Sequence, residues 1–345
     1  MLVSSVLRAK NAMGWRVGVW TCFAILLMSM LSLAPYLTSQ SEVVRMRNAL
    51  LLVDGNEASL DWAPPQIPAG FLHEQGPSDP VFLEAVKRLG LADMPSDWER
   101  AVAISRHLLA RSSTSGGAIQ SDLRTTYSRI LTKGDGYCGD FTRVFSALAT
   151  AAGIPVRSWA FSFDGFGGHG HVWPEIWNRQ LKRWQLVDIF DNNYFTLSDG
   201  VAISALEFRR AMKEYPRELR LVPLYSGARP GYVIEEKAWD YYRRGLPEWY
   251  LYWGSNVFTY ERAFLVKSFV HLSRSLEQFG GMVQGVFPGI RILRDPANQV
   301  QEAALIRLRQ HLLFVGGLSA VTLVALGVCL AGWWLSRRRY MRSQG

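Results

Sequence analysis

Cysteine is scarce in this chain, and that scarcity limits what the protein can be. Three cysteines occur in 345 residues, and two of them, Cys22 and Cys329, lie inside long apolar runs. Cys138 therefore has no partner outside those runs, which excludes a small domain held together by disulfides. A lone thiol is either a small buried apolar group or a reactive one, and Cys138 taken by itself does not distinguish the two.

Acidic residues are absent from both ends of the chain, which explains most of the formal net charge of +9. Of the 38 basic residues, three precede the first apolar run and four follow the last one: Arg8, Lys10, Arg16, Arg337, Arg338, Arg339 and Arg342. The middle, 38–311, keeps 31 basic and 29 acidic residues, a net charge of about +2. This distribution does not predict nucleic-acid binding.

Charged residues are also missing from two runs whose length suits a membrane. The run 17–37 has 21 residues without a charge, and the run 312–335 has 24. Because a helix of about 20 apolar residues spans a bilayer, we predict a transmembrane helix at each. The basic outer flanks, 1–16 and 336–345, predict cytoplasmic termini in an inner membrane, with 38–311 in the periplasm or its equivalent. The alternatives are a cleaved signal peptide for the first run and a buried core helix for the second.

Between the two runs, residue patterns predict three parts. Residues 38–94 are rich in Gly and Pro and predict an extracytoplasmic connector with one short helix near 80–91. Residues 95–200 carry helical patterns followed by strand-like ones, which is typical of an α+β domain. Residues 201–311 predict a mostly helical, aromatic-rich extension, with helices at 203–214, 235–245 and 259–278 and aromatic or apolar loops at 247–254 and 287–293.

Cys138 lies where a helix is expected to begin. The turn at Gly136 precedes it, and apolar residues recur at helical spacing as far as Ala152. The first amides of a helix stabilise a thiolate, or an oxyanion formed beside it. Asp135 and Asp140 would oppose such a charge if they lay close to the sulfur.

Three strand-like runs follow the helix, at 158–163, 171–178 and 183–190. If the last two form a hairpin that turns on two residues, His171 and Asp188 are direct cross-strand neighbours, with Cβ atoms roughly 4.5–5.5 Å apart. A thiol nucleophile needs an imidazole base that is oriented by a third group. The pair is therefore a candidate for that role.

The same hairpin predicts an aromatic-lined site. Side chains alternate along a strand, so His171, Trp173 and Glu175 share one face, and Trp184 lies on the facing run. We expect Trp173, Glu175, Trp184 and His169 to form the wall of a substrate site. His169, in a glycine-rich loop, is the rival base. A half-buried aromatic hairpin with incidental polar residues is the simpler alternative.

Three segments, in this order, resemble the transglutaminase-like superfamily. Its nucleophile segment is similar to GYCGDFTRVFSALATAAGIPVR at 136–157, its His-x-Trp-x-Glu strand to HVWPEIW at 171–177, and its Asp-bearing strand to WQLVDIF at 184–190. The resemblance covers about 95–195 and has no counterpart in 201–311.

The resemblance implies a fold and a set of roles. The fold is α+β, a papain-like core in which the helix bearing Cys138 packs on an antiparallel sheet, here with two flanking transmembrane helices and a mostly helical C-terminal extension. Cys138 would be the nucleophile, His171 the general base and acid, and Asp188 the orienting carboxylate. No cofactor and no metal is expected.

The implied chemistry is acyl transfer through a thioester, on a protein or peptide carrying a carboxamide or peptide bond. Water as acceptor makes a peptidase or amidase, whereas an amine makes a transglutaminase, and the residues favour neither. Membrane-anchored bacterial-type members of the superfamily suggest cell-envelope substrates. One alternative is a non-catalytic docking module of an envelope or surface-polymer assembly, with 201–311 facing a partner. A metal hydrolase that uses His169, His171 and Glu175 is the other.

Overall fold

The chain divides into two compact units, each described by itself. The helical unit is Met1–Leu50 with Ala304–Gly345, and the sheet unit is Leu51–Ala303. The computed structural model describes residues 2–53, 55, 60–64, 66–111, 117–226, 232 and 234–341, with the backbone alone for 2–12 and 339–341.

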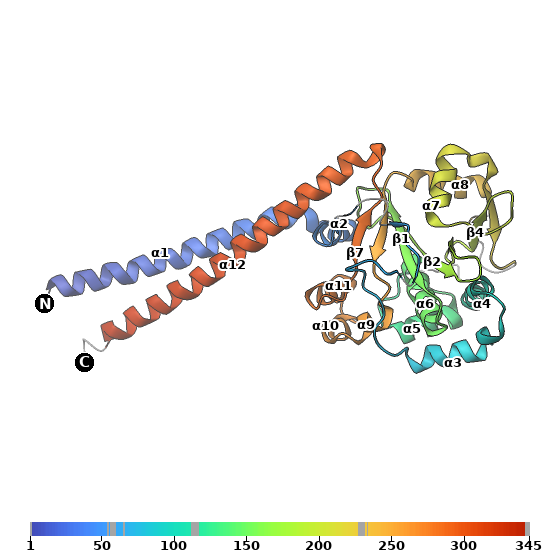
Figure 1. Ribbon diagram of the computed structural model, residues 1–345. Helices are drawn as coiled ribbons and strands as arrows, with labels where there is room; N and C mark the ends of the chain where they lie inside the picture. The colour runs from blue at the N-terminus through green and yellow to red at the C-terminus, as the bar shows by residue number, and fades with distance from the viewer. Residues whose placement is uncertain are drawn as a thin grey trace. The chain divides into compact units, whose positions relative to one another are not determined.

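The helical unit contains two long helices that run side by side (Figure 1). Its elements are α1 (Leu2–Leu33), the 3₁₀ turn η1 (Ala34–Leu37), α2 (Gln40–Leu50) and the part of α12 (Gln299–Met341) that follows Ala303. The two long helices lie close, since a Cβ added at Gly18 would lie 2.7 Å from the Cys329 sulfur. The Ser32 hydroxyl lies 3.3 Å from Nε2 of His311.

Two helical segments, Met13–Leu37 and Pro296–Arg338, are long and apolar enough to cross a membrane. In their most apolar stretches only 17% and 11% of the residues are buried. The core helix of a soluble protein is mostly buried, so this exposure disfavours the buried-helix alternative for 312–335. Length and composition leave the signal-peptide alternative for the first segment open.

A five-stranded antiparallel sheet is the centre of the sheet unit, and its strand order is β3-β2-β1-β6-β7. Its strands are β1 (Val156–Ser162), β2 (Gly170–Asn178), β3 (Arg183–Leu186), β6 (Trp249–Trp253) and β7 (Gly289–Ile292). A second sheet pairs β4 (Asn193–Thr196) with β5 (Arg220–Pro223). The α+β expectation with an antiparallel sheet is confirmed.

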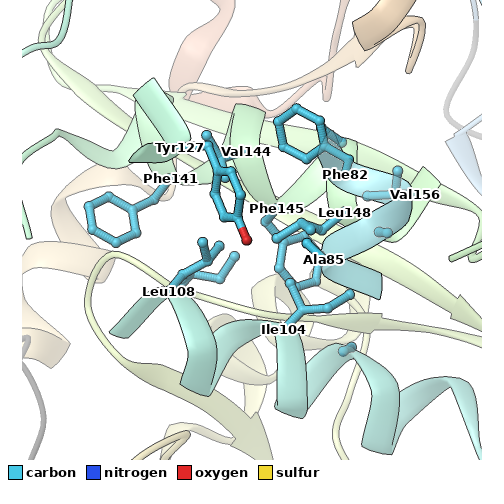
Figure 2. Close-up of a cluster of buried hydrophobic side chains, with 14 of the residues drawn as sticks. Phe82, Ala85, Ile104, Leu108, Tyr127, Phe141, Val144, Phe145, Leu148 and Val156 are labelled. Atoms are coloured by element: carbon cyan, nitrogen blue, oxygen red, sulfur yellow. The ribbon is translucent and has the colours of Figure 1, made fainter. Parts of the chain in front are cut away.

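One face of the sheet packs on a helical core. Its helices are α3 (Pro80–Arg88), α4 (Asp97–Leu109), α5 (Leu123–Lys133) and α6 (Cys138–Ala151). Figure 2 shows their apolar side chains gathered around α6, with Phe141, Val144, Phe145 and Leu148 fully buried. Val156 of β1 belongs to the same cluster. This packing fixes α6, and therefore Cys138 at its first turn, against the sheet.

The opposite face packs on an aromatic core. Trp159 of β1, Trp173 of β2 and Trp249 of β6 are fully buried there, and side-chain alternation places them on the face away from Val156 and Ile176. The aromatic core also receives side chains from α7 (Ala205–Glu214) and α8 (Glu235–Gly245). The remaining elements of the sheet unit are η3 (Leu91–Asp93), η4 (Pro216–Glu218), α9 (Val257–Arg262), α10 (Phe264–Phe269), α11 (Arg274–Val283) and η5 (Pro296–Asn298).

In the C-terminal extension, the helices expected at 203–214 and 235–245 are confirmed as α7 and α8, but other segments differ from the prediction. The segments 247–254 and 287–293, expected as loops, contain β6 and β7 of the central sheet. They are strands because β6 pairs with β1, a segment about 90 residues earlier, and this partner cannot be read from local pattern. The single helix expected at 259–278 is three short ones, broken where Ala263 has extended dihedrals and again before Arg274. The helix expected near 80–91 is confirmed as α3, whereas α2 in the expected connector was not predicted.

Candidate active site

The thiol of Cys138 lies at the first turn of a well-packed helix and remains partly exposed. Gly136, at φ 119°, turns the chain into α6 in a conformation that disfavours other residues. The backbone N–H of Tyr137 donates to the Asp140 carboxylate at 3.0 Å, so the Asp140 side chain ties down the start of the helix. The N-terminus of a helix favours a negative charge near it, such as a thiolate at Cys138.

The two carboxylates near Cys138 are both paired with cations. Asp140 accepts from the backbone N–H of Ile119 at 3.0 Å and lies 3.3 Å from the guanidinium of Arg274. Asp135 accepts from Arg129 at 2.6 Å. Their negative charges are therefore largely compensated, so the two carboxylates oppose a thiolate at Cys138 only weakly.

His171 and Asp188 lie in direct hydrogen-bond contact. The Nε2 atom of His171 is 2.9 Å from each carboxylate oxygen of Asp188, and both side chains are almost fully buried. His171 is the second residue of β2, beside the first turn of α6, where Gly139 lies against Val172. With Nε2 occupied by Asp188, Nδ1 is the ring nitrogen left for the Cys138 thiol.

The route by which these two residues meet differs from the predicted one. Strands β2 and β3 pair Glu175 with Leu186 and Trp177 with Trp184, so the turn between them has four residues and not two. Under this register Asp188 is not opposite His171, and the predicted cross-strand pairing is wrong. Asp188 lies beyond the end of β3, where it exchanges two backbone hydrogen bonds of 2.8 Å with Asn193. This bend directs its side chain to His171.

The longer turn has a clear local cause. Asn178 accepts from the backbone N–H groups of Gln180 and Leu181 through its side-chain oxygen, at 3.0 and 3.1 Å. Lys182 then adopts a left-handed conformation with φ 52° before β3 begins. Asparagine side chains commonly organise turns in this way, and they override a two-residue estimate of turn length.

Two tyrosines of α8 complete the surroundings of His171. The hydroxyl of Tyr242 donates to Oδ2 of Asp188 at 2.8 Å and is fully buried. The ring of Tyr241 lies 5.7 Å from the His171 ring, and its hydroxyl lies 3.4 Å from the carbonyl of Gly170. Sequence reasoning missed both, because a Tyr-Tyr pair on an amphipathic helix gives no local signal of which carboxylate or imidazole it will meet.

Burial and the neighbouring groups act in opposite directions on the pKa of His171. Burial disfavours the imidazolium of His171, but the charge and hydrogen bond of Asp188 and the hydrogen bond with Cys138 outweigh burial and raise the pKa of His171 well above its usual 6.5. Burial first, and then the nearby charge of Cys138, raises the pKa of Tyr241, so its hydroxyl stays protonated. The contacts of His171 with Asp188 and Cys138 therefore favour the protonated form of its ring.

The four residues expected to form the site wall have different surroundings. Trp173 lies edge-on to His171 at 5.2 Å but is fully buried in the aromatic core. Glu175 and Trp184 both contact the buried guanidinium of Arg157, Glu175 at 2.6 Å and Trp184 at 4.0 Å from its ring centre. The exposed ring of His169 pairs with Asp164 at 3.2 Å. Trp173, Glu175 and Trp184 are thus enclosed side chains, and the assignment of these four residues to a substrate-site wall stays a prediction.

The arrangement of His171, Asp188 and Asp191 could accommodate a metal ion, since one ligand atom from each lies within 4.8 Å of the others. Asp188, however, already accepts from Tyr242, from the backbone N–H of Asp191 at 3.2 Å and from His171. This saturation favours a hydrogen-bonded His–Asp pair over a ligand set. The metal set expected as an alternative is not assembled, because Glu175 is bound to Arg157 and His169 to Asp164.

Comparison with known families assigns part of the chain. Residues 85–189 match the family model of the transglutaminase-like superfamily. The match includes Cys138, His171 and Asp188 and ends one residue after Asp188, so it omits Tyr241 and Tyr242. No curated protein and no solved structure matches the chain.

Proposed function

We propose that this chain, with its transglutaminase-like domain at 85–189, is a membrane-anchored cysteine enzyme of acyl transfer. The observation that carries the proposal is the arrangement of a partly exposed thiol, a buried imidazole and a buried carboxylate that is 2.9 Å from that imidazole. Lone structural cysteines do not need a neighbouring imidazolium, whereas a nucleophilic thiolate does. Cys138 is the nucleophile, His171 the general acid and base, and Asp188 the residue that orients the ring.

The proposed chemistry proceeds in two steps. The Cys138 thiolate attacks a carboxamide or peptide carbonyl, and the resulting oxyanion accepts hydrogen bonds from the Cys138 amide and from the Tyr241 hydroxyl. Tyr241 is suggested as this second donor because it lies beside His171, interacts with Cys138 and stays protonated. His171 gives its proton to the leaving amine as the C–N bond breaks, which leaves a thioester. Water or a second amine, deprotonated by His171, then attacks the thioester and releases the thiolate.

The two apolar helical segments would anchor the enzyme in a membrane. In this proposal 17–37 and 312–335 cross the bilayer, with 1–16 and 336–345 in the cytoplasm because the basic residues lie there. The sheet unit is then periplasmic or otherwise extracytoplasmic. Its substrates would be envelope proteins or peptides within reach of the membrane.

The test is acylation of the full chain in detergent micelles with p-nitrophenyl acetate as a general acyl donor. Cys22 and Cys329 are replaced by Ala, so that Cys138 is the one thiol present. We expect an acetyl adduct on Cys138 by peptide mass analysis, turnover of the ester, and loss of both in Cys138→Ser. Adding glycine methyl ester then separates the two outcomes: an acetylated amine indicates transamidation, and acetate alone indicates hydrolysis.

The proposal would be contradicted if Cys138 stayed unmodified in the folded chain, or if it reacted no faster than the thiol of a free cysteine peptide. The domain would then be better described as a docking module of an envelope assembly. Loss of turnover on adding EDTA, without loss on adding iodoacetamide, would instead favour a metal at His171, Asp188 and Asp191.

A further inference from the structure

The helical hairpin α10–α11 exposes a row of large apolar side chains, here called the apolar ridge. It consists of Phe264, Leu272, Leu276, Phe279 and Val283, which are 73%, 69%, 45%, 58% and 61% exposed. On α11 the members follow one another at i, i+3 and i+7, the spacing of a single helix face. Contiguous exposed apolar surface of this kind marks an interaction site in a folded protein.

The other face of α11 is firmly attached to the sheet unit, so the ridge cannot turn inward. Gly280 packs against Leu265, where an added Cβ would lie 2.8 Å from the Leu265 Cβ. Glu277 is 1% exposed and accepts from the Tyr260 hydroxyl at 3.0 Å. Arg274 donates to the carbonyl of Ile119 at 2.5 Å. The ridge is therefore a fixed feature of the surface.

Charge on the hairpin has one sign. In 262–286, all of which the structure describes, the one acidic residue is the buried Glu277. The exposed basic side chains of this segment are Lys267, His271 and Arg262, of which Arg262 pairs with Glu74 at 3.1 Å. Apolar side chains flanked by cations and free of exposed carboxylates are typical of a helix that lies at an anionic lipid surface.

We propose that the apolar ridge docks into the lipid headgroup region of the membrane that anchors the chain. The proposal rests on the membrane anchoring proposed above and not on the acyl-transfer chemistry. Chain connectivity makes this occupant available, because eight residues separate Ala303, the end of the sheet unit, from the start of the run 312–335. Even fully extended, this link reaches only about 30 Å. The sheet unit therefore stays close to the bilayer, and the ridge adds a third contact to the two anchors.

The experiment places an environment-sensitive probe on the ridge in the full chain, reconstituted into liposomes. Cys22→Ala, Cys138→Ser and Cys329→Ala remove the native thiols, and Phe279→Cys carries a nitrobenzoxadiazole label. The matched control is Leu181→Cys, on the turn between β2 and β3, which is 52% exposed in the native chain. Flotation of the liposomes with the protein first establishes that the chain is inserted, and equal thermal midpoints establish that both variants are folded.

If the ridge docks, a spin-labelled lipid with its nitroxide near the headgroup quenches the probe at 279 several-fold more than the probe at 181. The difference should grow when anionic phosphatidylglycerol is added to phosphatidylcholine, and shrink in high salt. Equal, weak lipid quenching with strong quenching by aqueous iodide at 279 would overturn the proposal. So would a probe shielded from both quenchers together with crosslinks between copies at 279, because a second chain would then cover the ridge. A chain that fails to float with the liposomes would show that it is not anchored in the membrane, which overturns this proposal. That result would leave the acylation test of Cys138 unaffected.

Discussion

Two buried ionic clusters lie on the same face of strand β2, and they differ in what surrounds them. His171 and Glu175 are four residues apart, so their side chains point to the same side of the sheet. His171 is held by Asp188 and lies beside a partly exposed thiol. Glu175 is held by Arg157, and both of these side chains are fully enclosed. One cluster has access to solvent through Cys138, whereas the other is sealed.

The difference shows in how their hydrogen-bonding capacity is used. In the Glu175 cluster, one carboxylate oxygen accepts from Arg157 and Trp159 at 2.6 and 2.8 Å, and the other accepts from the Ala205 amide at 2.7 Å. All of these donors belong to the framework, so both oxygens of Glu175 are occupied by the protein itself. In the His171 cluster one ring nitrogen is bound and the other faces a reactive atom. Buried charge alone therefore does not identify a site; a group left available beside a reactive atom does.

The largest expected effect is on the sealed cluster. Glu175→Gln removes the carboxylate that pairs with the buried Arg157 at 2.6 Å, and breaking a buried pair costs about 3–5 kcal/mol. At roughly 2–4 °C per kcal/mol for a unit of this size, the thermal midpoint should fall by at least about 6 °C. Glu207→Gln is the control, since Glu207 pairs with the partly exposed Arg183, and its loss costs about 1 kcal/mol or less. A midpoint for Glu175→Gln no lower than that of the control would mean that the sealed cluster is not a stability element.

The next effect is on the open cluster and concerns reactivity. His171→Ala should slow alkylation of Cys138 by iodoacetamide at pH 6 by about 10²- to 10³-fold, because the imidazolium that stabilises the thiolate is removed. His169→Ala is the control, because His169 is exposed and paired with Asp164. Equal rates in the two variants would remove His171 from the mechanism, and a slower rate in the His169 variant would make His169 the base.

The sequence predicted that His171 and Asp188 of the open cluster lie together, but it did not predict the strand register around them. Cys138, His171 and Asp188 were predicted from a helix start, from a hairpin register and from the resemblance of three segments to the transglutaminase-like superfamily. The register that relates His171 to Asp188 was wrong by two residues, because the Asn178 side chain organises a longer turn. A side-chain hydrogen bond of that kind is not encoded in the hydrophobic pattern.

Contacts between segments distant in the chain explain the other misses. Strand β6 is a short aromatic run without a clear strand pattern of its own. It is a strand because it pairs with β1. Tyr242 meets Asp188 only because α8 packs on the aromatic core, 54 residues later in the chain. Equally, nothing local distinguishes Glu175 from a site residue, since its partners Arg157 and Ala205 are 18 and 30 residues away.

A smaller effect is expected from the third partner of the open cluster. Tyr242→Phe removes the hydroxyl that donates to Asp188, and we expect Cys138 alkylation to slow by about tenfold, the loss of one hydrogen bond to a charged group. The pH profile of alkylation should also shift, which a purely structural role would not produce. Tyr194→Phe is the control, because the Tyr194 ring packs against Trp98. A profile identical to that of the native chain would reduce Tyr242 to a packing residue.

The smallest expected effect is on the pH dependence of the thermal midpoint, which should differ between the two clusters. The folded chain raises the pKa of His171 above its unfolded value near 6.5, so the protonated ring stabilises the fold fully below pH 6.5. That stability is lost as the pH rises through the folded pKa, with a slope of at most about 1.4 kcal/mol per pH unit. The buried tyrosines titrate above their usual 10, and the lowered pKa of His107 acts below 6.5, so these groups do not titrate between pH 7 and 9.5. Thermal midpoints of the native chain should decline across this window, and His171→Gln should abolish the decline. Glu175→Gln, by contrast, should lower the midpoint equally at every pH in the window, since its partner Arg157 does not titrate there; a decline that survives in His171→Gln would assign it to another group.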